Sequence, residues 1–104
     1  MSLPLVFHPE VKFEIKESYL WYESIKEGLG ESLLHELESS YPIIQEAPQI
    51  WPKFRSIYHK YLLKKFPFSI LYSIEESQVT VYAVAHYSRR PYYWKDRPSS
   101  IASG

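Results

Sequence analysis

The sequence contains no cysteine, one methionine and only three glycines among its 104 residues. Without cysteine the chain has neither a disulfide framework nor thiolate chemistry, which fits a reducing compartment. No apolar run approaches the roughly 18 residues that a membrane-spanning helix needs. The N-terminal stretch MSLPLVFHPE lacks the basic start and apolar centre of a signal peptide. We therefore predict a cytoplasmic protein with no membrane partner.

The sequence also lacks net charge, because twelve basic residues balance twelve acidic ones. The distribution along the chain is more informative than the total. Between positions 51 and 97 there are nine lysines and arginines against three acidic residues. Such an asymmetry suggests a polyanionic target or an acidic protein partner. The alternative is that the basic and acidic halves attract each other within the fold.

Motifs for metal, cofactor or nucleophile chemistry are missing as well. The four histidines have no metal-ligand spacing. The glycines at Gly28 and Gly30 lack the longer pattern of a phosphate-binding loop, and no strand-turn-helix nucleophile elbow is present. Glu75 and Glu76 are more typical of a solubilising turn than of a general acid and base. We predict neither a metal nor a cofactor.

The most regular pattern in the chain predicts two strands in the segment 65–94, joined by the short polar turn Glu75–Ser77. Alternate residues repeat with the period of a pleated strand. The residues in between are largely apolar too, so both faces of these strands should be covered. The predicted face consists of Phe68, Ile70, Tyr72, Ile74, Val79, Val81, Ala83 and Ala85.

Helical spacing dominates the first half of the chain. A short apolar strand at 3–7 precedes an amphipathic helix that runs from Val11 to near Gly28. A second helix follows Gly30, and Pro42 predicts an end or kink near Tyr41. Because only a short glycine-bearing connection separates the two helices, we expect an antiparallel hairpin.

A further strand is predicted over the segment 54–65, where apolar residues alternate with polar ones. The element order is then β-α-α-β-β-β. This order predicts an α+β fold in which the two-helix hairpin packs on a mostly antiparallel, four-stranded twisted sheet. We assign residues 1–97 to a single domain and expect 98–104 to be a flexible tail.

Basic and aromatic residues crowd together directly after the last strand. Guanidinium groups clamp phosphates, and tyrosine or tryptophan rings stack on unpaired bases. Together with strand lysines, such a cluster could also cleave RNA without a metal, with His86 as the proton carrier. The alternative is that the arginines are solvated and the rings cover the core. The residues that we expect to converge at one sheet edge are Lys60, Lys64, Arg89, Arg90, Lys95 and Arg97.

Nearly the whole chain resembles the RelE/ParE toxin superfamily of bacterial type II toxin-antitoxin modules. The resemblance lies in VFHPEVKFEIKESYLWYE, GLGESLLHELE and KFPFSILYSIEESQVTVYAVAHYSRRPYYW. The ending AVAHYSRRPYYW is most similar to the ParE-like and plasmid-stabilisation branch. The resemblance implies a compact toxin fold and a cognate antitoxin that binds and silences it in a hetero-oligomer.

The resemblance implies one of two activities. ParE-like members inhibit DNA gyrase, whereas RelE-like members are ribosome-dependent endoribonucleases that cut mRNA. We expect a toxin that acts on a protein target such as gyrase. The alternative is a RelE-like ribonuclease, and a second alternative is an inactive toxin-like binding protein.

For site residues, the resemblance transfers only in part. If the protein is a ribonuclease, the catalytic residues are Lys60, His86, Arg89 and Tyr93. The positions of the strand arginine and the tail arginine are held by Ser69 and Tyr87. The remaining residues expected to bind the target or nucleic acid are Arg55, Lys64, Lys65, Arg90, Tyr92 and Trp94. The antitoxin is expected to dock on the helices and a sheet edge, with Trp21, Tyr22 and Trp51 as candidate contacts.

Overall fold

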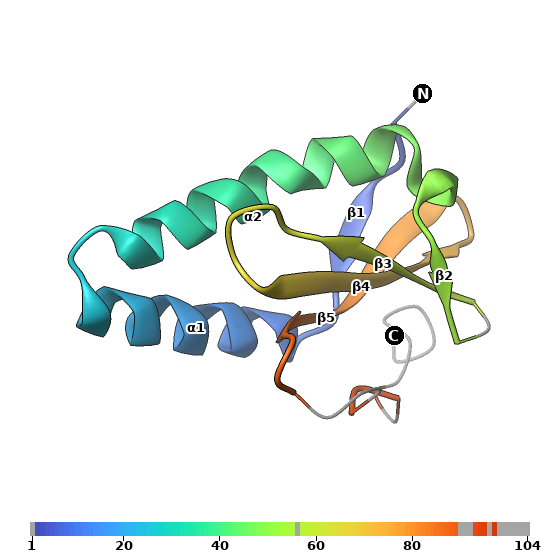
Figure 1. Ribbon diagram of the computed structural model, residues 1–104. Helices are drawn as coiled ribbons and strands as arrows, with labels where there is room; N and C mark the ends of the chain where they lie inside the picture. Colours follow the sequence, from blue (N-terminus) through green and yellow to red (C-terminus); the bar gives the residue numbers. More distant parts are fainter. Residues whose placement is uncertain (1, 56, 90–92, 96, 98–104) are drawn as a thin grey trace.

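The computed structural model describes residues 2–55, 57–89, 93–95 and 97, in which two helices pack against one sheet (Figure 1). Its strand order is β1-β5-β4-β3-β2, with β1 parallel to β5 and the other neighbours antiparallel. The α+β class is confirmed, and the predicted element order is confirmed apart from one additional strand. The elements are β1 (Leu5–Phe7), α1 (Val11–Ile25), α2 (Leu29–Glu46), the 3-10 helix η1 (Pro48–Ile50), β2 (Lys53–Phe54), β3 (Tyr58–Leu62), β4 (Phe68–Glu75) and β5 (Gln78–His86).

The strand predicted over 54–65 is in fact a small hairpin, so the sheet has five strands instead of four. The chain reverses at Arg55, whose φ of 57° lies in the left-handed region. Phe54 then pairs with Tyr58 across the turn. The segment 54–58 contains no glycine, proline, asparagine or aspartate, and for this reason the sequence did not reveal the turn.

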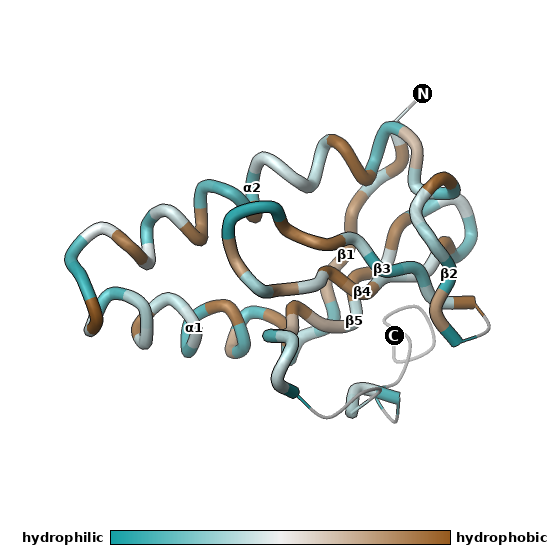
Figure 2. Tube along the Cα trace, viewed as in Figure 1, coloured by the Kyte–Doolittle hydropathy of each residue, from teal (hydrophilic) through white to brown (hydrophobic). Residues whose placement is uncertain are grey.

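The main core lies between the helices and one face of the sheet. Tyr72 is fully buried there, and its hydroxyl donates a hydrogen bond of 2.6 Å to the carbonyl of Pro48. In Figure 2 the apolar stretches gather in the central strands and recur at intervals along both helices. The residues of this core that are less than 2 % exposed include Val11, Leu33, Leu37, Ile44, Ile70, Tyr72, Val79 and Val81.

A β-bulge corrects the predicted faces of the last strand. Leu71 pairs with Ala83, but the next residue, Tyr72, pairs with Val81, so Tyr82 is an extra residue in β5. One extra residue exchanges the two faces of a strand. Val84 therefore packs in the main core. Ala83 and Ala85, which were predicted on the same face as Val81, pack instead in a second cluster with Leu71, Tyr82 and Trp94.

Of the two outcomes that Pro42 predicts, α2 does not end near Tyr41 but continues through Pro42 to Glu46. Contacts beyond the proline stabilise the last turn. Ile44 is fully buried. The amide of Leu3 donates to the carbonyl of Gln45 at 3.1 Å, and the side-chain amide of Gln45 donates to the carbonyl of Leu3 at 2.8 Å. These contacts offset the backbone hydrogen bond that proline cannot make.

The turn between β4 and β5 is short and conformationally costly. Its central residues, Glu76 and Ser77, both have positive φ, at 48° and 63°, as a type I′ turn requires. Side chains other than asparagine, aspartate and glycine are disfavoured there. Replacing this pair with Asn-Gly is expected to raise the free energy of unfolding by about 1 kcal/mol in urea titrations. The control Ser77→Ala keeps the cost and should not stabilise the protein.

Neither described helix combines the length and the apolar character needed to span a membrane.

Candidate functional site

The sheet face that carries the second cluster holds an open groove of about 380 Å³, here called the basic groove. Its floor consists of Ser69, Leu71 and Ala85, whose side chains come from the paired strands β4 and β5. Small side chains on the floor leave the space open. The wall residues that carry chemistry are Lys60, His86, Arg89 and Tyr93.

Both cations of the basic groove lie against aromatic rings. The ammonium group of Lys60 lies 4.3 Å from the ring centroid of Phe54. The guanidinium of Arg89 lies 3.9 Å from that of Tyr93. Cation–π contacts of this kind hold a charge in place without neutralising it. The groove therefore presents two oriented positive charges to an anionic ligand or an acidic surface.

His86 is less available for proton transfer than its position suggests. Its Nδ1 accepts a hydrogen bond of 3.0 Å from the backbone amide of Ser88, and its ring meets Phe68 edge to face at 5.2 Å. Since a backbone amide can only donate, Nδ1 carries no proton, and the neutral ring bears its proton on Nε2. In this tautomer the basic nitrogen of His86 already has a partner, and Nε2 is the ring atom left to donate a hydrogen bond.

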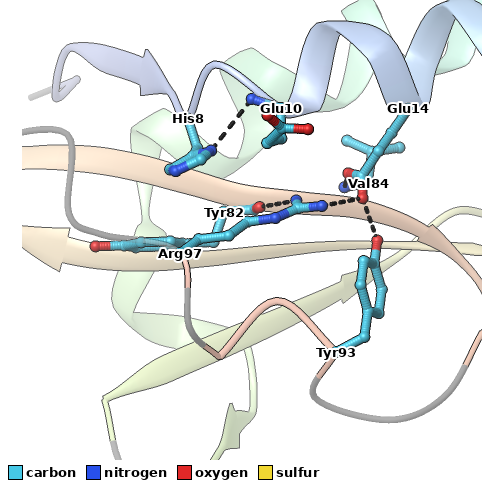
Figure 3. Close-up of polar contacts among 7 residues, drawn as sticks. All are labelled: His8, Glu10, Glu14, Tyr82, Val84, Tyr93 and Arg97. Atoms are coloured by element: carbon cyan, nitrogen blue, oxygen red, sulfur yellow. Dashed lines mark hydrogen bonds and ion pairs between the residues drawn. The ribbon is translucent and has the colours of Figure 1, made fainter.

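A buried carboxylate, Glu14, accepts a hydrogen bond from the groove residue Tyr93 (Figure 3). Glu14 of α1 is 8 % exposed. Its Oε1 accepts the amide of Val84 at 3.0 Å, while its Oε2 accepts the hydroxyl of Tyr93 and, at 2.8 Å, the guanidinium of Arg97. We call Glu14, Val84, Tyr93 and Arg97 the Glu14 cluster. It joins α1, β5 and the C-terminal segment, which lie far apart in the sequence.

The Glu14 cluster forms where β5 loses its neighbour. The short strand β1 covers β5 only as far as Val81, whose carbonyl accepts the amide of His8 at 2.8 Å. Beyond that point the backbone of β5 needs other partners, because a buried peptide group without a hydrogen bond is costly. Glu14 takes the amide of Val84, and Arg97 donates to the carbonyl of Tyr82 at 2.7 Å.

Burial raises the pKa of Tyr93 far above its ordinary value, and the hydrogen bond to Glu14 raises it further. The phenol therefore stays protonated at neutral pH, and its hydroxyl donates a hydrogen bond to Glu14. Burial, followed by the charge of Arg97, lowers the pKa of the neighbouring His8. His8 is thus neutral near pH 7, and its Nδ1 accepts the amide of Glu10 at 3.1 Å.

Two of the predicted site residues lie on another surface. Lys64 and Lys65 line a groove between α2 and β3, not the basic groove. The amide of Lys64 donates to the carboxylate of Glu36 at 2.5 Å, and that of Lys65 donates to it at 3.1 Å. The expectation that Lys64 converges with Arg89 is therefore wrong. Glu36 holds this turn against α2 instead.

The remaining predicted residues have different fates. Trp94 lines the groove but is only 2 % exposed and packs on Tyr58 at 4.5 Å, so its ring belongs to the second cluster. Arg55 lies beside the groove, 5.6 Å from the ring centroid of Phe54. Arg90 and Tyr92 lie outside the described residues. In the described part of the chain, no three His, Asp or Glu side chains gather as metal ligands would.

Sequence reasoning missed Glu14, and it placed Arg97 in the basic cluster without identifying its carboxylate partner. A signal for Glu14 was present, because it lies three residues after Val11 and next to Ile15, inside the apolar stripe of α1. A carboxylate on an apolar face is buried only when it has partners. Those partners are 70 to 83 residues away in the sequence, and no local pattern identifies them.

The proposed antitoxin contacts are only partly exposed. Trp21 is 61 % exposed, and Phe13, Leu20 and Ile25 on the same helix are each more than half exposed. Tyr22 is half-buried and packs edge to face on Phe66 at 5.2 Å. Trp51 packs on Tyr61 at 4.8 Å. Of the three residues, Trp21 is the one that a partner can reach.

No protein-family profile matches the sequence, and no curated protein matches it. Solved structures do match the fold. A chain of the chromosomal ParDE TA system from P. aeruginosa superposes with a TM-score of 0.73, at 11% identity, over 82% of this chain and 96% of that one. The E. coli toxin RelE, as a free mutant with two arginines changed to alanine, gives 0.64 at 17% identity, over 85% and 86% of the two chains. The protein therefore has the fold of the RelE/ParE toxin superfamily, as its sequence predicts.

Proposed function

We propose that the protein is the toxin of a type II toxin-antitoxin module, silenced by a cognate antitoxin and acting on a protein target such as DNA gyrase. The likeness to a ParDE chain over 82% of the sequence supports the toxin assignment. The composition of the basic groove supports the protein target. The groove offers Lys60 and Arg89 as oriented cations and His86 as a donor.

The observation that carries this proposal concerns the missing base. RNA cleavage by attack of the 2′-hydroxyl on the adjacent phosphate needs a group that removes the proton of that hydroxyl. Nδ1 of His86 is occupied by an amide donor, and the phenol of Tyr93 is tied to Glu14. Neither His86 nor Tyr93, the two candidate bases among the described residues that line the groove, has a free basic atom. Such a groove is better suited to binding an acidic surface than to catalysis.

The ribonuclease remains the second candidate, and a specific observation favours it. Lys60, His86, Arg89 and Tyr93, the catalytic residues that we expect of a ribonuclease, all line one groove. A bound RNA that displaced the Ser88 amide from His86 would free a basic nitrogen near two cations. The two candidates differ in what they do to messages and to DNA in a growing cell.

Induced expression in bacteria separates the candidates. A gyrase inhibitor is expected to cause cleaved DNA complexes and an SOS response while mRNA stays intact. A ribonuclease would cut translated messages, as mapped by primer extension. An inactive binding protein would leave growth unaffected without any antitoxin, and this outcome would contradict both activities.

Arg89→Ala is expected to remove growth inhibition under either activity, because it deletes a cation that the groove holds in a fixed position. The variant is expected to need at least a tenfold higher inducer level to arrest growth. A factor of about ten in binding is on the order of the effect of a single charge-assisted contact. Lys95→Ala is the matched control, since Lys95 is an exposed cation that does not line the groove. Equal activity of the wild type and Arg89→Ala would exclude the basic groove as the site.

The antitoxin is proposed to dock along the outer edge of β3. On its other side β3 pairs with β4, and the amide of Leu63 donates to the carbonyl of Phe68. In an antiparallel pair every second residue hydrogen-bonds to the neighbouring strand, and the residues between them direct their amides and carbonyls to the opposite edge. Leu62 therefore directs its amide and carbonyl to the outer edge, and β2 reaches only as far as His59. An open edge of this kind accepts an extended peptide as an added strand.

A further inference from the structure

Glu14 connects segments that the chain itself keeps apart. Its partners Val84, Tyr93 and Arg97 follow it by 70, 79 and 83 residues. A carboxylate that is 8 % exposed is costly unless donors surround it. These three donors supply an amide, a phenol and a cation, and the ion pair with Arg97 measures 2.8 Å.

The Glu14 cluster and the basic groove share Tyr93. Its hydroxyl donates to Glu14, and its ring carries the guanidinium of Arg89 at 3.9 Å. The guanidinium of Arg97 also lies 5.2 Å from the centroid of that ring. The position of Arg89 in the groove thus depends on the position of Tyr93, and Tyr93 is held by a residue of α1 that does not itself line the groove.

Trp94, the residue after Tyr93, is held in place by packing. Trp94 is 2 % exposed, and its ring meets Tyr58 of β3 at 4.5 Å. The C-terminal segment therefore has two adjacent anchors, the hydrogen bond from Tyr93 to Glu14 and the packing of Trp94 on Tyr58, so that loss of the first is expected to loosen the second. The polar anchor fixes which way the Tyr93 ring faces, because only its hydroxyl reaches Glu14.

We propose that Glu14 is a positioning residue of the basic groove: it holds Tyr93 and Arg97 so that Arg89 stands at the groove wall. Glu14 does not contact the target itself. The placement of the C-terminal segment stands independently of what the protein does, whereas its effect on toxicity rests on the proposed function. Two separate measurements test these parts.

The first measurement follows the C-terminal segment by ¹⁹F NMR of protein labelled with 5-fluorotryptophan. The chain has three tryptophans in different environments: Trp21 is 61 % exposed, Trp51 is half-buried and Trp94 is 2 % exposed. Single Trp→Phe variants assign the three signals. In Glu14→Gln the Trp94 signal is expected to shift towards that of the exposed Trp21 and to gain a solvent isotope shift, while the Trp51 signal stays in place.

The matched control is Glu17→Gln, which makes the same chemical change at an exposed position of the same helix. It should leave all three signals unchanged. If Glu14→Gln fails to fold, Tyr93→Phe and Arg97→Gln decide instead, because each removes one partner from the cluster and leaves α1 intact. Each is expected to move the Trp94 signal in the same direction, and combining them is expected to move it further. An unchanged Trp94 signal in these variants would overturn the proposal.

The second measurement is growth inhibition, with melting temperatures recorded for each variant. Folded Glu14→Gln is expected to lose most of its inhibition although it retains Lys60 and Arg89, and Glu17→Gln is expected to keep it. Stronger inhibition by Glu14→Gln would overturn the proposal, since it would mean that the cluster restrains the cations. If the wild type does not inhibit growth, the proposed function fails, and the NMR result still decides the role of Glu14.

Discussion

Gly30→Ala is expected to lower the free energy of unfolding by about 2–3 kcal/mol, a typical cost of overpacking a well-packed core. A Cβ atom at Gly30 would lie 2.5 Å from the carbonyl oxygen of Tyr19 and 2.7 Å from its ring. The nearer atom belongs to the backbone of α1, so it cannot move without the helix. Alanine's better helix propensity, worth about 1 kcal/mol, offsets only part of this cost.

The two helices approach this closely because a carboxylate joins them. The side chain of Glu23 accepts the amide of Gly28 at 3.0 Å and that of Gly30 at 2.8 Å, at the N-terminal end of α2. These backbone hydrogen bonds lower the pKa of Glu23. Separating the helices to make room for a methyl group would also lengthen these bonds. The midpoint of thermal unfolding is expected to fall on the order of 10–20 °C, as measured by circular dichroism.

Gly28 is the matched control, because replacing it strains the backbone but creates no steric clash. Its φ is +89°, and a Cβ atom there would meet nothing within 4 Å. Gly28→Ala should therefore cost only the strain of a left-handed conformation, about 1 kcal/mol. Gly28→Asn should recover part of that cost, since asparagine tolerates this conformation. Equal losses from Gly30→Ala and Gly28→Ala would mean that the close approach at Gly30 is not limiting.

The order of elements could be predicted because it follows from the spacing of apolar residues that are close together in the sequence. The apolar stripe of α1 and the alternation in β4 are complete within one segment of chain, and a helix–strand arrangement follows from them. The bulge at Tyr82 could not be predicted, because it depends on which residues of β4 lie opposite β5. As a result, the predicted faces were right up to Val81 and wrong after it.

The continuation of α2 through Pro42 has a similar explanation. Local chemistry predicts a break, and it is overridden by contacts with residues that are distant in sequence, such as Leu3. At the candidate site, the sequence identified the groove cations Lys60 and Arg89 but not the residue that holds the segment after them. Glu14 was recognisable as an acid on an apolar face, yet its purpose depends on Tyr93 and Arg97 at the other end of the chain.

If the protein has the antitoxin that we propose, binding of this partner is expected to raise the melting temperature by on the order of 20 °C. A ligand of the folded state present at about 1,000 times its Kd adds roughly 4 kcal/mol to the free energy of unfolding, and each kcal/mol shifts the midpoint by about 4–8 °C in a domain of this size. The partner to test is the product of the gene beside this one. The measurement is differential scanning calorimetry of the protein with and without this partner.

The site of binding decides which variant reduces this shift. Leu62 is 54 % exposed, lies on the open edge of β3 and directs its amide outwards. Leu62→Pro removes that donor without removing a hydrogen bond to β4, and proline is tolerated on an edge strand. This variant should therefore melt near the free wild type and lose most of the shift on adding the proposed partner. Trp21→Ala is the comparison on α1, and it should keep most of the shift if the partner docks as a strand. If the shift is lost with Trp21→Ala and kept with Leu62→Pro, the partner binds the exposed face of α1. Equal melting temperatures of the wild type with and without the partner would contradict docking altogether.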